Sequence, residues 1–92
     1  MGTFKLGTLS DGRLRVRVPF DVEASIEDGV HTAEVFEICE WGAGKTHSEA
    51  IADLQRDIVE AYFFLEEKQD SLGPGLQLEW RILQEKITKA TS

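Results

Sequence analysis

The sequence predicts an α+β domain in which a three-stranded antiparallel meander packs against one long helix, followed by a C-terminal helix. Apolar and polar residues alternate through the first part of the chain, which is typical of half-buried strands. From residue 46 onward, apolar residues recur every three or four positions, as in amphipathic helices. We expect a single domain over residues 1–92, with the sheet at 3–41, the first helix at 47–67 and the C-terminal helix at 74–89.

The long strand over residues 13–27 has the most regular alternation. One face of it carries only apolar residues, namely Leu14, Val16, Val18, Phe20, Val22, Ala24 and Ile26. A shorter strand over residues 3–9 precedes it across Asp11-Gly12, and Asp-Gly is a strong hairpin signal. Pro19 removes one amide donor, which predicts a bend, a bulge or an edge position there.

A second Asp-Gly pair, at residues 28–29, leads into the third strand over residues 30–41. A two-residue turn there pairs Ala24 with Ala33, Val22 with Val35, Val18 with Cys39 and Val16 with Trp41. The same register sets Glu23 against Glu34, a like-charge pair that argues mildly against it.

The first helix begins with a capping box. The Thr46 hydroxyl is placed to accept from the Glu49 amide, while the Glu49 carboxylate reaches back to an unpaired donor. The buried stripe of this helix is expected at Ala50, Ile51, Leu54, Ile58, Tyr62 and Leu65. After a break at residues 72–75, a second stripe follows at Leu76, Trp80, Leu83 and Ile87.

Residues 42–46, Gly-Ala-Gly-Lys-Thr, are similar to the end of a phosphate-binding loop. Such a loop needs a further glycine five residues before its Gly-Lys-Thr, and Cys39 stands at that position. We therefore interpret the segment as a structural turn from strand to capped helix. Cys39 itself is expected to be a small buried hydrophobe.

No catalytic or metal-binding arrangement is predicted. His31 and His47 lack metal-ligand spacing, and Ser48 has no evident histidine and carboxylate partners. The carboxylates Asp53, Asp57 and Glu60 are expected to form a solvated helix face. The sequence therefore predicts a protein that is not an enzyme and that holds no cofactor and no metal.

Charge is distributed unevenly along the chain. The net charge of −7 divides into +3 over residues 1–20 and −10 over residues 21–92. An acidic body repels nucleic acid and suits a basic protein partner. No apolar run is long enough to span a bilayer and no signal-peptide core is evident, so we expect a cytoplasmic protein that does not bind membranes.

Two groups of residues are candidates for a partner or self-association surface. Arg13, Arg15 and Arg17 form a one-sided basic row about 13 Å long, which suits phosphates or acidic protein. Pairing of Arg17 with Glu40 within the chain is the simplest role for that arginine. The remaining candidates are apolar residues beyond the expected core: Phe36, Ile38, Phe63 and Phe64.

The predicted strand hairpin is followed by three matching segments, Gly44-Lys45-Thr46, Glu49-Ala50 and Leu54. With this arrangement, roughly residues 14–66 of the chain resemble the HicB-like antitoxin domain. The resemblance implies a degenerate ribonuclease-H-like unit without catalytic carboxylates that forms dimers or tetramers. It also implies binding and blocking of a small basic toxin-like ribonuclease. In that family a C-terminal module often binds DNA, but only one helix remains here after residue 66, which speaks against DNA binding.

The leading hypothesis is therefore a non-enzymatic, oligomeric, HicB-like protein-binding module of the bacterial cytoplasm that acts like the antitoxin of a toxin-antitoxin system. The alternatives are a nucleic-acid-binding regulator that uses the arginine row, or an oligomeric protein of another function.

Overall fold

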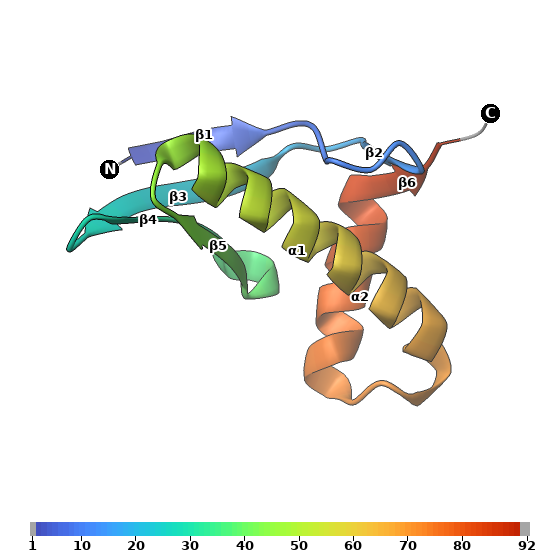
Figure 1. Ribbon diagram of the computed structural model, residues 1–92. Helices are drawn as coiled ribbons and strands as arrows, with labels where there is room; N and C mark the ends of the chain where they lie inside the picture. The colour runs from blue at the N-terminus through green and yellow to red at the C-terminus, as the bar shows by residue number, and fades with distance from the viewer. Residues whose placement is uncertain (1, 91–92) are drawn as a thin grey trace.

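The computed structural model describes residues 2–90 and contains a four-stranded antiparallel sheet with a long helix across one face (Figure 1). The sheet order is β1 (Gly2–Leu6), β3 (Phe20–Glu27), β4 (Val30–Val35) and β5 (Glu40–Gly44). Helix α1 (His47–Lys68) packs along β5 and β4, and helix α2 (Pro74–Lys86) returns beside the second half of α1. The α+β class is confirmed, whereas the expected strand count of three is wrong.

The turn between β3 and β4 forms as the sequence predicts. Asp28 and Gly29 both adopt positive φ, at 52° and 78°. Such values allow a two-residue turn whose twist matches the flanking strands. The resulting register pairs Ala24 with Ala33 and places Glu23 opposite Glu34 on an exposed face of the sheet.

The expected single strand over residues 30–41 is broken in the middle. A 3₁₀ turn, η1 (Phe36–Ile38), follows β4, and Cys39 adopts a left-handed conformation with φ 55°. The chain thereby reverses, and β5 pairs antiparallel with β4 instead of continuing alongside β3. The predicted pairs of Val18 with Cys39 and of Val16 with Trp41 are therefore wrong. Cys39 is exposed at the reversal and not buried as expected.

The predicted long strand over residues 13–27 is also divided. Residues 17–19, including Pro19, separate β3 from the short strand β2 (Leu14–Val16). β2 pairs with the C-terminal strand β6 (Ile87–Lys89), while β1 pairs with β3. The expected hairpin at Asp11-Gly12 is therefore wrong: neither residue has the positive φ of a tight hairpin, and the Asp11 side chain instead accepts from the Arg13 amide at 2.8 Å.

Helix α1 begins with the predicted cap. The Thr46 hydroxyl accepts from the Glu49 amide at 3.1 Å, and the Glu49 carboxylate accepts from the Lys45 amide at 2.9 Å. The helix spans nearly the expected residues, and its predicted stripe is buried except at Ile51, which is half-buried. The cap therefore positions α1 directly after β5.

Gly42 and Gly44 belong to strand β5 and not to a turn, contrary to expectation. A Cβ on Gly42 would lie 2.3 Å from the backbone nitrogen of Leu54, and one on Gly44 would lie 2.5 Å from the Glu49 Cβ. No side chain fits between the strand and the helix at these two positions. The glycines therefore serve close packing of β5 against α1.

Helix α2 begins at Pro74, as predicted, but ends three residues early. Ile87 has extended angles, and its amide donates to the Leu83 carbonyl, so the expected helix at 87–89 is instead β6. Leu76 is 43% exposed and lies outside the core, although the sequence placed it in the buried stripe. The sequence also predicts fraying over residues 89–92; Lys89 instead ends β6, and residues 91–92 lie outside the described residues.

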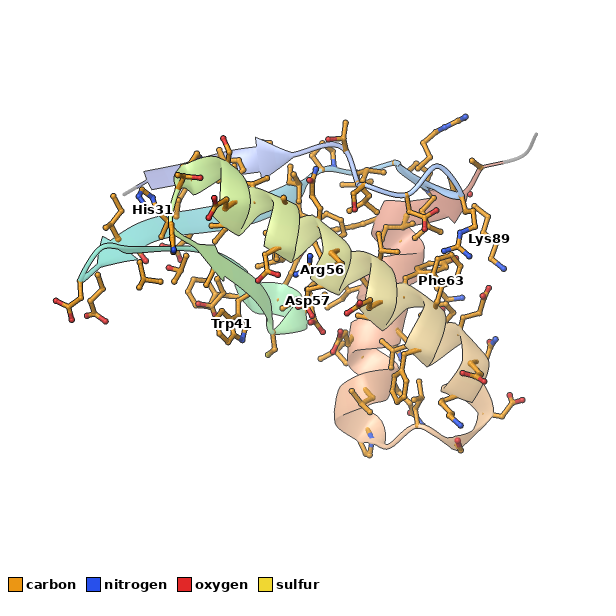
Figure 2. The ribbon with its side chains drawn as sticks, viewed as in Figure 1. His31, Trp41, Arg56, Asp57, Phe63 and Lys89 are labelled. Carbon is orange, nitrogen blue, oxygen red and sulfur yellow. The ribbon has the colours of Figure 1, made fainter. Side chains whose placement is uncertain are left out.

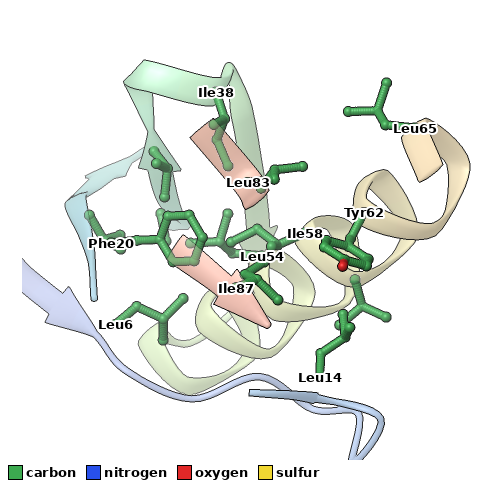
Figure 3. Packing of buried hydrophobic residues seen from close by; sticks show 14 of the residues in the cluster. Leu6, Leu14, Phe20, Ile38, Leu54, Ile58, Tyr62, Leu65, Leu83 and Ile87 are labelled. Atoms are coloured by element: carbon green, nitrogen blue, oxygen red, sulfur yellow. The ribbon is translucent and has the colours of Figure 1, made fainter. Parts of the chain in front are cut away.

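The core joins the sheet, both helices and the β2–β6 ribbon (Figure 3). Its largest fully buried side chains are Phe20, Ile38, Leu54, Ile58, Leu65, Leu83, Ile87, Val22 and Val35. Ile87 reaches the core from β6, so the C-terminal strand closes one end of the hydrophobic layer. Within residues 2–90, no helix is long and apolar enough to cross a membrane.

Candidate functional site: an acidic groove between β5, α1 and α2

Three carboxylates of α1 bind the outer edge of β5. Every second amide of an edge strand points away from the neighbouring strand and needs another acceptor. The Lys45 amide donates to Glu49 at 2.9 Å, the Ala43 amide to Asp53 at 3.0 Å and the Trp41 amide to Asp57 at 3.3 Å. Acceptors four residues apart on the helix thus match donors two residues apart on the strand.

This arrangement corrects the expectation that Asp53 and Asp57 lie on a solvated helix face. They form a ladder that satisfies the free edge of β5 and blocks strand addition there. Asp53 also pairs with Arg56 on the next turn of the helix. Asp57, at the far end of the ladder, is in addition part of a second group of carboxylates.

That second group surrounds a groove of about 310 Å³, which we call the acidic groove. Four carboxylates line it: Glu40 from β5, Asp57 and Glu60 from α1, and Glu79 from α2. The apolar part of its lining is formed by Ala61, Phe64, Leu65 and Leu76. Phe64 and Leu76 are 52% and 43% exposed, so the groove presents apolar surface to solvent as well as negative charge.

The four carboxylates of the acidic groove form no ion pair with a lysine or arginine in residues 2–90. Two cations on the same helices pair with other groups: Arg56 of α1 pairs with Asp53, and Lys86 of α2 pairs with Glu37 at 2.8 Å and donates to the Pro19 carbonyl at 3.1 Å. Uncompensated like charges on adjacent elements destabilise a fold unless something neutralises them. Here the neutralising species at Glu40 is a proton.

Glu40 is the most perturbed acid of the groove. Its partial burial, together with the neighbouring Glu79 and Asp57 carboxyl groups, raises the pKa of Glu40 to about 10. Desolvation disfavours the charged carboxylate, and a protonated carboxyl can donate a hydrogen bond to either neighbour. A pKa raised this far keeps Glu40 neutral at pH 7.

The arginine row is exposed, but two of its members are engaged within the chain. Arg13 makes an ion pair with Asp11 at 2.6 Å and lies 4.3 Å from the centroid of the Phe63 ring. Its side-chain hydrogen bonds lower the pKa of Asp11 to about 2. Arg17 donates to the Glu85 carbonyl at 2.9 Å instead of pairing with Glu40 as expected. Of the row, Arg15 alone makes no side-chain contact of this kind within residues 2–90.

The apolar candidates for a partner surface divide into three groups. Ile38 is 1% exposed and belongs to the core, so its assignment to a surface is wrong. Phe63 is half-buried beneath Arg13. Phe36 and Phe64 are more than half exposed but lie in separate hollows, Phe64 in the acidic groove and Phe36 beside Asp21 and Glu23.

Neither histidine lines the acidic groove. His31 lies within β4, and His47 packs edge-on against the Phe4 ring at 5.6 Å between centroids. Among residues 2–90, no group of three or more histidine, cysteine, aspartate or glutamate side chains has a metal-binding arrangement.

Sequence reasoning missed Glu40 and Glu79 as site residues. Glu40 was assigned to the end of the third strand as the partner of Arg17, and Glu79 was one of many acids on a terminal helix. The available signal was a pair of acids, Glu40 and Asp57, in segments that a short strand-to-helix connection folds back on each other. Glu79 joins them only through the return of α2.

Comparison with protein-family models, with curated proteins and with solved structures found no match for this chain. Its function is therefore argued from the geometry and charge of its own surface.

Proposed function

We propose that this chain is a non-enzymatic, HicB-like protein-binding module that holds a small basic protein through the acidic groove. The observation that carries the proposal is the convergence of four carboxylates from β5, α1 and α2 around exposed Phe64 and Leu76. Basic side chains neutralise such a cluster, while apolar side chains cover the floor of the groove.

The overall charge supports a basic partner. With a net charge of −7, the molecule attracts a cationic protein over a distance of about one Debye length, roughly 8 Å at physiological ionic strength. Such attraction raises association rates and weakens with added salt. The alternative of nucleic-acid binding has less support, because Arg13 and Arg17 already have partners within the chain.

Binding by variants tests the proposal. The tagged chain should retain a small basic protein from its host, and a reading frame for such a protein should lie beside its own. Glu60→Lys and Glu79→Lys should each abolish retention, since they reverse charge at the groove without entering the core. Glu67→Lys makes the same change on an exposed part of α1 and should have no effect.

Two results would refute the proposal. One is that no basic protein is retained by the wild-type chain at low ionic strength. The other is retention that is equally strong for the groove variants and for Glu67→Lys, since partner binding would then be independent of the groove.

We also propose self-association, through the sheet face opposite α1. Phe36 and Trp41 are each 58% exposed, and Gly42, the neighbour of Trp41, faces α1, so Trp41 faces the other way (Figure 2). Exposed aromatic residues are enriched at protein interfaces. Sedimentation should show a dimer or tetramer that Trp41→Ser converts to a monomer. A monomeric wild-type chain at high concentration would contradict this.

A further inference from the structure

We infer that the free edge of strand β1 pairs with β1 of a second copy of this chain, so that two four-stranded sheets join into one continuous sheet. The contact uses the edge of the sheet and therefore goes beyond the self-association proposed above, which uses the exposed face around Trp41. It is also separate from the acidic groove, which lies beside β5 at the opposite edge.

The strand register identifies which backbone groups of β1 point outward. The two-residue turn at residues 28–29 makes Glu27 and Val30 a hydrogen-bonded pair, and this bonding toward β4 recurs at every second residue of β3. The alternate residues of β3 therefore bond to β1, where their partners are Gly2, Phe4 and Leu6. The amides and carbonyls of Thr3 and Lys5 are left pointing outward, and both residues are exposed.

The two edges of the sheet differ in how these outward groups are satisfied. On β5 the same alternation predicts outward amides at Trp41 and Ala43, and both of them donate to carboxylates of α1. On β1, the outermost strand at the top of Figure 1, no backbone group of residues 2–90 other than those of β3 bonds to the strand. Unpaired amides and carbonyls on an edge are a template for a further strand. Strand β1 is therefore the open edge, while β5 is the closed one.

The residues of β1 suit pairing with an identical strand. An antiparallel copy centred on Phe4 sets Thr3 against Lys5 of the second copy, and each such pair exchanges both of its backbone hydrogen bonds. Lys5 already pairs with Asp21 of β3, so it leaves no free charge to repel another strand. Glu23 lies beside Thr3 on β3, which places Lys5 of the second copy two strand spacings, roughly 10 Å, from that carboxylate. A register centred on Lys5 would instead bring two lysines together.

The centre of this pairing is aromatic and the assembly is finite. Phe4 meets Phe4 of the second copy in a non-hydrogen-bonded pair, where side chains on neighbouring strands are closest. Its ring is half-buried and packs edge-on against His47, so its remaining exposed surface is available to the second copy. Both outer edges of the joined sheet are then β5 strands, whose amides are closed by α1. Pairing therefore stops at two copies along this direction.

Amide hydrogen exchange followed by NMR tests the inference. A pair of five-residue strands is marginally stable by itself, so we expect pairing at high protein concentration. Trp41→Ser, which lacks the other proposed contact and is expected to be a monomer in dilute solution, is the suitable starting material. Where about nine-tenths of the chain is paired, exchange at the Thr3 and Lys5 amides should slow about tenfold, because only unpaired chains exchange there. The Phe4 amide, bonded to β3, should be protected at every concentration. Exchange at Thr3 and Lys5 that is independent of concentration would overturn the inference.

A proline variant tests the outward amide directly. Thr3→Pro removes a donor that the monomer does not use, and proline is tolerated on an edge strand where the amide faces solvent. Thr3→Val keeps the amide and a branched side chain and is the matched control. In the Trp41→Ser chain, we expect both variants to unfold at the same urea concentration, and only Thr3→Val to form the dimer in sedimentation. Equal dimerisation of the two variants would contradict the edge contact. A large loss of stability in Thr3→Pro would also contradict it, since the Thr3 amide would then be bonded within the monomer.

Discussion

Replacing Gly42 with alanine should separate strand β5 from helix α1. The added Cβ would lie 2.3 Å from the Leu54 nitrogen, 2.6 Å from the Ala50 carbonyl oxygen and 2.8 Å from the Leu54 Cα. Ordinary contact begins at 3.4 Å, so the helix backbone must retreat by about 1.1 Å at Leu54. All three atoms are backbone, and no side chain can rotate away to make room. Because overpacking of cores costs about 1–3 kcal/mol, we expect at least the upper value here.

Urea unfolding followed by circular dichroism measures this cost. A loss of about 3 kcal/mol should lower the urea midpoint by roughly 1–3 M, or the melting temperature by about 12–24 °C. Gly75→Ala is the matched control, because no atom lies within 4 Å of its Cβ position in the first turn of α2. Alanine is the better helix former there and should stabilise by up to about 1 kcal/mol. A Gly42→Ala variant that loses less than about 1 kcal/mol would refute the close-packing explanation.

Three further changes test the cap, the edge ladder and the raised pKa. Thr46→Ala removes the acceptor of the Glu49 amide and should cost about 0.5–2 kcal/mol, so an unchanged melting curve would contradict the cap. Asp53→Ala leaves the Ala43 amide without its acceptor; it should cost about 1 kcal/mol and increase self-association by light scattering, since the edge of β5 opens. Folding raises the pKa of Glu40 from 4.5 to about 10, so the wild-type free energy of unfolding should fall as the pH rises through this range. After allowance for solvent screening, Glu40→Gln should be more stable than the wild type by about 1 kcal/mol at pH 7, with a flatter pH profile in chemical denaturation; an equally steep profile would assign the dependence to other groups.

The sequence correctly predicted those turns and helices that are determined by residues close together along the chain. The positive-φ turn at Asp28-Gly29, the cap at Thr46 and the periodicity of α1 all arise within a few residues along the chain. All three form in the structure as predicted, because no contact with a distant part of the chain overrides them. The interruption near Pro19 was predicted for the same reason.

The predicted strand pairing was wrong where the two paired strands are distant in sequence. Alternation from Leu14 to Ile26 cannot show that its first three residues pair with β6 at the other end of the chain. Nor does it show the left-handed conformation of Cys39, because a non-glycine residue adopts that conformation only where the surrounding fold supports it. Ile38 was assigned to a surface because the alternation was extended through this reversal.

The sequence by itself determined that this protein is an acidic α+β domain with a capped helix directly after its glycine-containing segment. Tertiary structure decided the role of those glycines, the number of strands and the composition of the acidic groove. The physical reason is distance along the chain: capping and periodicity act over a few residues. The groove, by contrast, depends on where a reversal at Cys39 and the return of α2 bring Glu40, Asp57 and Glu79 together.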